Sequence, residues 1–220
     1  MISLAVWLYC TFTLGLRDVE LLLAERGIIV SYETVRSWCA KFAQRFANGL
    51  RRRRARPGDR WHLDEVFIRI RGKLQYLWRA VDQDGNTLDI LVQSRRNTAA
   101  AKRFFKKLLK GLCDLPCVIV TDKLKSYGAA KREILPGVEH RQNRYLNNRA
   151  ENSHQPTRRR ERQMQRFKSP GQAQRFLSAH GPIRGHFHPR RHRMSAAEYR
   201  RVRAAAFQVW QQETCACKAA

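Results

Sequence analysis

Length, composition and charge already limit the class of protein that this chain can be. It has 220 residues, 43% of them hydrophobic, which is enough for one sizeable core and a small additional module. Lysine and arginine together number 44 against 18 acidic residues, giving a net charge of +26. Aromatic residues make up 10% of the chain, so it is not a disordered basic tail. A folded protein with this charge is typical of nucleic-acid binding, either by an enzyme or by a structural RNA-binding protein.

The apolar stretch at residues 1–16 is predicted to be a core helix. It lacks the basic region and the cleavage site of a signal peptide, and it is too short to span a bilayer. The six cysteines form no pair of CxxC motifs, and scattered reduced thiols are typical of a cytosolic protein. We therefore expect no membrane partner and a cytoplasmic, nucleoid-associated protein.

Residues 1–50 are predicted to form a helix-turn-helix module. Residues 17–26 carry apolar side chains at helical spacing, Gly27 ends that helix, and Ser31 is a candidate N-cap for the next one. A short glycine-bearing connection between two such helices is typical of DNA-binding modules, although an ordinary helical hairpin is the alternative. The outward residues of the second helix that we expect to contact DNA are Tyr32, Arg36 and Lys41.

Residues 51–60 are predicted to be a basic linker between two domains. Their arginine run and the following Pro57-Gly58 interrupt the helical pattern. The residues of this segment that we expect to contact the DNA backbone are Arg51, Arg52, Arg53 and Arg54. Residues 61–200 are then assigned to a catalytic domain, and residues 201–220 to a C-terminal helix and tail.

The pattern changes to that of strands from Trp61 onward. Apolar residues alternate after Asp64, a second run follows the Arg71-Gly72 turn, and Asp84-Gly85 closes a hairpin onto a third run. Four further elements are predicted in order: a helix at 99–112, a strand at 117–121, a helix at 126–134 and a strand at 139–143. The predicted fold class is α/β, with a mixed sheet in the order β-β-β-α-β-α.

Three carboxylates occupy positions at which they could converge. Asp64 lies in the first strand, Asp122 directly follows the fourth, and Glu151 lies on a late helix that the Asn147-Asn148 pair would cap. If the first and fourth strands are neighbours, these carboxylates need a divalent cation, and hard oxygen ligands select magnesium or manganese. Two such ions could promote displacement at a phosphodiester. Alternatively, Asp122 only caps a turn.

Four nearby features have competing interpretations. Glu65 is a rival carboxylate on the first strand, but strand alternation directs it to the opposite face. Glu161 is a rival third carboxylate, yet Pro156 should break the helix before it, and its arginine neighbours suit a surface ion pair.

His154 either contacts a phosphate or packs in the core. The basic run at 157–162 is a solvated helix face or, beside an acidic metal site, a DNA track whose expected contacts are Arg158, Arg159 and Arg160.

Three blocks of the sequence, in order, resemble a known family of enzymes. They are WHLDE, VTDK-x3-Y and HRQNRYLNNRAENSH, and together they resemble DDE transposases of short bacterial insertion sequences, specifically the IS6 group. The resemblance extends from residue 10 to residue 190, approximately, and includes the hairpin segment RGKLQYLWRAVDQDGNTLDILVQSRRN. It implies a helix-turn-helix followed by a ribonuclease-H-like catalytic domain. It also implies that Asp64, Asp122 and Glu151 bind two magnesium or manganese ions. It aligns Lys123 with a lysine of the family, and we expect Lys123 to contact DNA.

The resemblance implies a transposase that acts on double-stranded DNA as a homo-oligomer. Such an enzyme binds the terminal inverted repeats, cleaves at the element ends with water, and joins the resulting 3′-hydroxyl to target DNA. The alternative is a decayed transposase that binds DNA without catalysing a reaction.

Two departures from the family pattern bear on these expectations. Only 28 residues separate Asp122 from Glu151, fewer than is usual in the group, and we expect the shortening to fall in a helix or loop before residue 139. The chain also begins without the polar, basic segment that usually precedes the first helix, so a shortened or misassigned start is expected. That start concerns recognition of the terminal repeats more than the catalytic domain.

Overall fold

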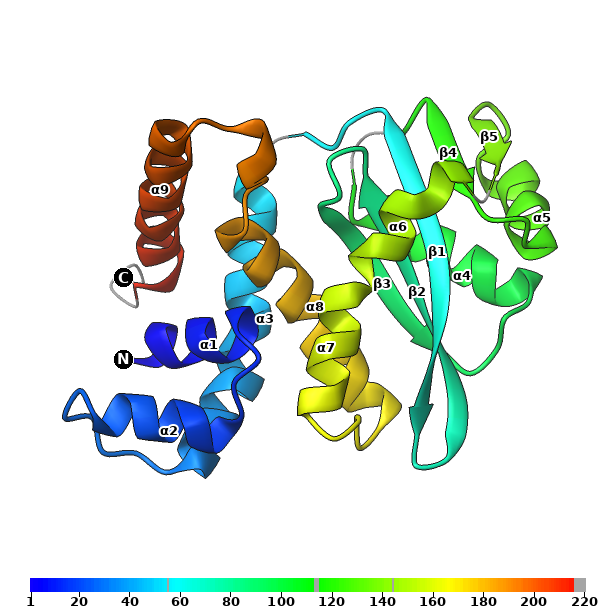
Figure 1. The fold of residues 1–220 in the computed structure, drawn as a ribbon. Coiled ribbons are helices and arrows are strands. Elements are labelled where there is room, and N and C mark those ends of the chain that lie inside the picture. Colours follow the sequence, from blue (N-terminus) through cyan, green and yellow to red (C-terminus); the bar gives the residue numbers. More distant parts are fainter. Residues whose placement is uncertain (55, 113–114, 144, 216–220) are drawn as a thin grey trace. The chain divides into compact units, whose positions relative to one another are not determined.

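The computed structural model describes residues 1–54, 56–112, 115–143 and 145–215 (Figure 1). These residues form two compact units, one made of Met1–Arg54 with Ser178–Ala220 and the other of Ala55–Leu177. The sequence had assigned residues 178–200 to the catalytic domain, whereas the structure groups them with the N-terminal helices. Part of the predicted linker, residue 55, and part of the predicted tail, residues 216–220, lie outside the described residues.

The first unit is all-helical. Its helices are α1 (Ile2–Thr11), α2 (Leu16–Ala24), α3 (Tyr32–Arg53), the end of α8 (Pro170–Phe187) and α9 (Ala196–Thr214). Aromatic rings hold them together, because Trp7 packs edge-on against Phe187, and Phe46 packs edge-on against Trp210. These contacts explain why the C-terminal helices group with the N-terminal ones.

The predicted helix-turn-helix elements are present in this unit. Helix α2 is followed by Gly27 in the left-handed region, at φ 73°, and the Ser31 side chain caps α3 by accepting a hydrogen bond from the Thr34 amide. Helix α3 extends beyond the predicted domain boundary and ends at Arg53, so the first part of the predicted linker is helical. None of the described helices is long and apolar enough to cross a membrane.

The second unit is an α/β domain built on one five-stranded sheet. Its strands are β1 (Arg60–Ile70), β2 (Lys73–Asp82), β3 (Thr87–Gln93), β4 (Val118–Thr121) and β5 (Glu139–Gln142), in the spatial order β3-β2-β1-β4-β5. The first three strands are antiparallel neighbours, while β4 runs parallel to both β1 and β5. Its helices are α4 (Thr98–Lys110), α5 (Lys125–Ile134), α6 (Asn148–Ser153), α7 (Gln155–Gln163) and the start of α8. The predicted ribonuclease-H-like order is confirmed.

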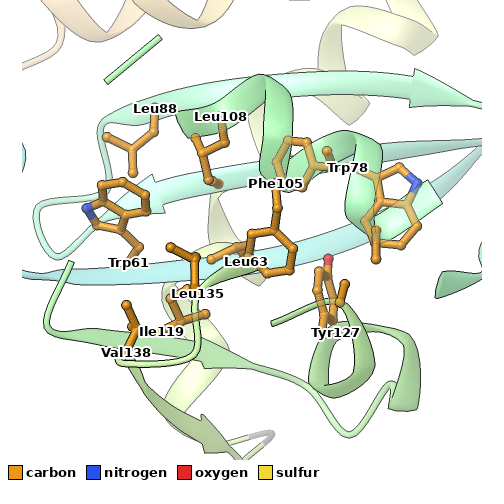
Figure 2. Packing of buried hydrophobic residues seen from close by; sticks show 14 of the residues in the cluster. Trp61, Leu63, Trp78, Leu88, Phe105, Leu108, Ile119, Tyr127, Leu135 and Val138 are labelled. Carbon is orange, nitrogen blue, oxygen red and sulfur yellow. The ribbon is translucent and has the colours of Figure 1, made fainter. Parts of the chain in front are cut away.

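Both faces of this sheet are covered. On one face Leu63 and Trp78 pack with Phe105 of α4 and Tyr127 of α5 (Figure 2). On the other face a second apolar cluster joins the strands to the segment that leads into α8, through Ile68, Ile90, Phe167 and Leu177. A strand buried on both faces is rigid, so side chains carried by β1 are held in fixed positions.

Candidate active site

The three predicted carboxylates line one cavity. Asp64 comes from the middle of β1, Asp122 from the residue after β4, and Glu151 from α6, and the cavity has a volume of about 880 Å³. The first and fourth strands are parallel neighbours, as the convergence requires, with His62 paired to Val120 two residues before each aspartate. The other residues that line the cavity are Val66, Lys123, Gln142, Asn143 and Asn147.

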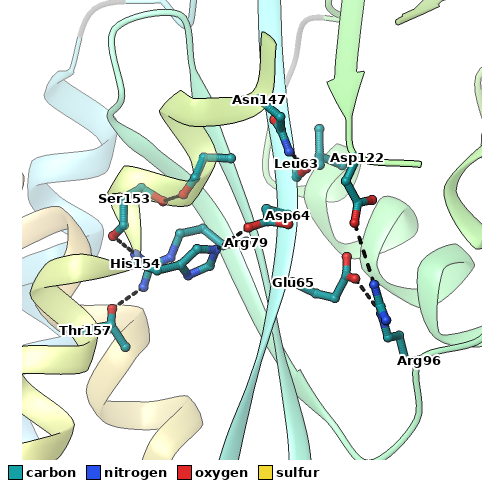
Figure 3. A network of polar contacts seen from close by, with 11 residues as sticks. Leu63, Asp64, Glu65, Arg79, Arg96, Asp122, Asn147, Ser153, His154 and Thr157 are labelled. Carbon is teal, nitrogen blue, oxygen red and sulfur yellow. Dashed lines mark hydrogen bonds and ion pairs between the residues drawn. The ribbon is translucent and has the colours of Figure 1, made fainter. Parts of the chain in front are cut away.

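Asp122 is held by one backbone contact and one cation. Its Oδ1 accepts a hydrogen bond of 3.0 Å from the Leu124 amide, and its Oδ2 lies 3.6 Å from Nη2 of Arg96 (Figure 3). Arg96 follows β3, in the loop before α4, and its side chain is 43% exposed. Asp122, which lies in a loop, is therefore held in part by an ion pair that is accessible to solvent.

Glu65 is nearer to the site than strand alternation indicated. It does share alternate positions of β1 with the core residue Leu63, as predicted. However, β4 stops pairing with β1 at His62, so the edge of β1 is open beyond that point. One oxygen each from Glu65, Asp64 and Asp122 then lie within 4.8 Å of one another. Glu65 is therefore on the predicted face of β1, yet its carboxylate lies close to those of both aspartates.

Burial and charge both act on the Glu65 carboxylate. Its side chain is only 1% exposed, and its Oε1 accepts a 2.5 Å ion-pair contact from Nε of Arg96. Burial, with the nearby negative charge of Asp122, raises the pKa of Glu65 to about 7, while Arg96 and the Tyr127 hydroxyl oppose that shift. Arg96 therefore bridges two carboxylates, one in a strand and one in a loop.

Asp64 has different neighbours on its other side. Its Oδ2 lies 3.3 Å from Nε2 of His154, whose side chain is 4% exposed. Burial, followed by the positive charge of Arg79, outweighs this contact and lowers the pKa of His154 to about 4, so the imidazole is neutral at neutral pH. His154 is thus buried, as the packing interpretation expects, and it also lines the cavity that contains Glu151.

A buried arginine supports the same region. Arg79 of β2 is paired in register with Asp64, and it is 4% exposed. Its guanidinium donates hydrogen bonds to the Ser153 carbonyl and to the Thr157 hydroxyl, at the junction of α6 and α7 (Figure 3). Burial lowers the pKa of Arg79 to about 10, which leaves the side chain charged at neutral pH. The junction is thus fastened to the central strands.

The helix that carries Glu151 ends as predicted but lacks the predicted side-chain cap at its start. Asn147 stands at its N-cap position, but its amide does not cap the helix and instead donates to the Leu63 carbonyl at 2.8 Å. The predicted break before Pro156 is present, since α6 ends at Ser153 and α7 starts with proline in its first turn. This break gives Glu151 and Glu161 separate helices.

Glu161 does not line the cavity of the other carboxylates. It lies in a different cavity with Arg162 and Arg166, and Arg158 approaches its carboxylate at 3.6 Å. Glu161 does have an arginine partner, but it is Arg158 rather than one of the flanking arginines, and Glu161 is mostly buried rather than on the surface. The cavity lining therefore favours Glu151 over Glu161 as the third carboxylate.

The basic run on α7 is divided between surface and core. Arg158, Arg159 and an arginine not singled out from the sequence, Arg162, line a cavity of about 390 Å³ that also contains Glu151. Arg160 is the exception, because it is 1% exposed and its guanidinium lies 5.3 Å from the ring centroid of Phe176. The expectation that Arg160 contacts DNA is wrong for this reason.

The remaining predicted DNA contacts lie on the helical unit, except Lys123, which is exposed beside Asp122. Of these predicted contacts, Tyr32, Arg36, Lys41, Arg52 and Arg53 are exposed on α3, while Arg51 and Arg54 are half-buried. Some already have partners, since Arg36 pairs with Glu33, Arg51 donates to the Ser178 carbonyl, and Arg53 pairs with Glu213. Arg51 and Arg53 therefore fasten α3 to the C-terminal helices.

Sequence reasoning did not single out Arg79 or Arg96. A signal for Arg96 was available, because β1, β3 and β4 run in the same direction, so the segments after β3 and β4 emerge at the same end of the sheet. Arg79 had no such signal. From the sequence alone, an arginine within a strand of apolar residues is expected to face solvent, because its partner on the neighbouring strand is not known.

Comparison with known proteins identifies the family. Residues 58–190 match the DDE domain of the IS240 transposase type. The transposase of the insertion sequence-like element IS431mec from Staphylococcus aureus is 33% identical over 159 residues, which cover 70% of each chain. The transposase of IS257 in transposon Tn4003, also from Staphylococcus aureus, is 31% identical over 159 residues with the same coverage.

The solved structures that match this chain do so weakly, with TM-scores below 0.5. The catalytic core domain of HTLV-2 integrase in complex with magnesium aligns with a TM-score of 0.37 and 12% identity, over 58% of this chain and 99% of that chain. A simian T-cell lymphotropic virus intasome aligns with a TM-score of 0.38 and 15% identity, over 63% of this chain and 53% of that chain.

The DDE domain covers more than half of the chain, and it defines an enzyme of the polynucleotidyl transferase class. The identity to two insertion-sequence transposases extends over more than two thirds of each of them. The chain therefore belongs to the DDE transposase family, in its IS6 group.

Proposed function

We propose that this transposase binds the terminal inverted repeats of its element, cleaves DNA at their ends, and joins the freed 3′-hydroxyl to target DNA. The observation that carries the proposal is the convergence of Asp64, Asp122 and Glu151 on one cavity, from three separate elements. Carboxylates repel one another, so a fold that gathers three of them is suited to cations.

The donor set fits magnesium or manganese. Its ligand atoms are carboxylate oxygens, and neither cysteine nor histidine lines the cavity among the described residues. We assign Asp64, Asp122 and Glu151 as the ligands of two ions, and the oxygens of Gln142 and Asn143 at the cavity wall suit water-mediated contacts. When bound, the ions supply an activated attacking oxygen and a stabilised leaving oxygen for phosphodiester displacement.

The residues around the carboxylates would bind and orient the DNA. Lys123 is exposed beside Asp122, and Arg158, Arg159 and Arg162 lie beside Glu151. Cations on both sides of an acidic cavity can neutralise the phosphates that flank a scissile bond while the acidic groups hold the metal. Cleavage by water and attack by the 3′-hydroxyl are then two uses of one geometry, since both are in-line displacements at phosphorus.

Recognition of the element ends is assigned to the helical unit. Tyr32, Arg36 and Lys41 are exposed on the first half of α3, which follows the capped turn after α2. A helix in this position suits the major groove of double-stranded DNA. We also propose a homo-oligomer, because one acidic cavity per chain must act on two element ends that are held together.

A DNA-binding relic without catalytic activity is the alternative, and an activity assay separates the two. The purified full chain is incubated with DNA that carries the sequences flanking its gene on both sides, with Mg²⁺ or with a chelator. The proposal predicts Mg²⁺-dependent 3′-end cleavage and joining by the wild type, and neither reaction in Asp64→Asn. Binding of the repeats without cleavage at any Mg²⁺ concentration would establish the relic.

A further inference from the structure

We propose that His154 is a positioning residue, which orients the Asp64 carboxylate for metal binding and couples the helix of Glu151 to strand β1. The inference rests on the proposed function, since it concerns the carboxylates assigned there as ligands. It begins from an imidazole that is buried next to Asp64 and has no other polar partner among the described residues.

The surroundings of His154 are unusual for a core residue. The residue is 3% exposed, and neither of its ring nitrogens makes a hydrogen bond of good geometry within the described part of the chain. Leaving a buried polar group unsatisfied is costly, and an apolar side chain at this position would avoid that penalty. The Asp64 carboxylate, 3.3 Å from Nε2, is the partner toward which the ring is directed (Figure 3).

The chain position of His154 lets it act on two carboxylates at once. It separates α6 from α7, and its backbone amide donates to the Glu151 carbonyl at 3.1 Å while its ring faces Asp64. A displacement of the helix that carries Glu151 therefore displaces the contact to Asp64. Arg79 holds this junction in place through the Ser153 carbonyl and the Thr157 hydroxyl.

An imidazole suits this task better than a cationic side chain. A lysine or arginine beside Asp64 would compete with the metal, because a cation paired with a ligand neutralises part of the carboxylate charge that binds the metal. A neutral N–H donor at Nε2 fixes one carboxylate oxygen without cancelling that charge. Donors of this kind behind metal ligands typically contribute 10–100-fold, approximately, to metal affinity or activity.

The test measures Mn²⁺ binding to the full, DNA-free chain by electron paramagnetic resonance. His154→Asn and His154→Gln form a matched pair, because both introduce an amide but only the longer glutamine can bring its N–H to Asp64. We expect His154→Asn to weaken Mn²⁺ binding about tenfold or more, and His154→Gln to remain within about threefold of wild type. The Mg²⁺ concentration for half-maximal cleavage should rise in the same order.

Thr157→Val is the structural control, since it removes a hydroxyl that Arg79 uses at the same junction but does not touch Asp64. Thermal denaturation of all variants shows how much each one loosens the junction. Equal Mn²⁺ affinity in His154→Asn and wild type would overturn the inference. It would also be overturned if Thr157→Val weakened Mn²⁺ binding as much as His154→Asn at a similar loss of thermal stability.

The wild type and Asp64→Asn separate this inference from the proposed function. Mn²⁺ binding that depends on Asp64, together with cleavage, supports the proposed function, and the matched histidine variants then decide the role of His154 alone. If the wild type bound no Mn²⁺ at Asp64, the proposed function and the inference would both fall.

Discussion

The two aspartates of the site are supported in opposite ways. Asp64 lies in a strand, with a buried neutral imidazole and a buried arginine behind it, whereas Asp122 lies after a strand end and meets an exposed arginine. The side chains of Asp64 and Asp122 are 16% and 29% exposed. The strand-borne carboxylate is thus held by the interior of the fold, and the loop-borne one by charge that water and ions can screen.

The difference follows from where regular structure ends. Asp64 is paired across the sheet with Arg79, so its backbone cannot move without breaking the β1–β2 ladder. β4 ends one residue before Asp122, which therefore depends on its Leu124 contact and on Arg96. Substitutions near Asp64 and substitutions near Asp122 should therefore have different effects, and the following experiments test that difference.

Removing a carboxylate has the largest expected effect, on either side. Asp64→Asn, Asp122→Asn and Glu151→Gln should each lower the rates of cleavage and joining by at least about 10³-fold, because losing a metal ligand removes several kcal/mol of transition-state stabilisation. Binding of the terminal repeats should be unchanged in a mobility-shift assay. Glu161→Gln is the control and should retain measurable joining. An inactive Glu161→Gln beside an active Glu151→Gln would move the third ligand to α7.

Substituting the arginine next to each aspartate should lower the stability of the protein to different extents on the two sides of the site. Arg79→Met leaves the α6–α7 junction without two buried hydrogen bonds, and breaking such a buried charged network costs about 3–5 kcal/mol. Arg96→Met removes a guanidinium that is itself 43% exposed, and the buried Glu65 carboxyl that it leaves behind can take up a proton, so the cost should be smaller, about 1–2 kcal/mol. Urea unfolding of both variants measures the contrast. Equal losses would mean that the loop-borne aspartate is as firmly embedded as the strand-borne one.

Stability should also depend on pH through Glu65, on the Asp122 side. Its folded pKa of about 7 is raised above the ordinary value of 4.5, so its contribution is complete below pH 4.5 and is lost as pH rises through 7. Relative to Glu65→Gln, which mimics the protonated acid, the wild type should lose up to about 3 kcal/mol between pH 4.5 and pH 8 in the presence of a chelator. Parallel stability curves for the two proteins would contradict the raised pKa.

The smallest expected effect compares neighbouring arginines of α7. Arg159 is exposed beside Glu151, so Arg159→Gln should leave stability unchanged and lower the slope of log affinity against log salt by about 1. Arg160→Gln should do the reverse, because its guanidinium is buried over Phe176. Filter binding at several salt concentrations measures the slope, and an unchanged slope for Arg159→Gln would remove it from the DNA track.

Local patterns in the sequence were sufficient to predict the helices and strands and their order along the chain. The hairpin at Asp84-Gly85, the capping serine at Ser31 and the helix break before Pro156 all depend on neighbouring residues, and each is present in the structure. The neighbouring arrangement of β1 and β4, which brings Asp64 and Asp122 together, was only a condition in the sequence analysis and is shown by the structure. Periodicity alone does not fix which strands pair, since that depends on contacts between distant residues.

What the sequence by itself determined is the identity of the chemistry-bearing side chains and the elements that carry them. Only the tertiary structure decided which of these side chains are buried, and hence which act on the site. Arg160 lies within a run of surface arginines but fills the core, and Glu65 alternates away from Asp64 but reaches the site around the open edge of β1. Burial and the end of a strand pairing are set by segments far apart in the sequence, so no local pattern records them.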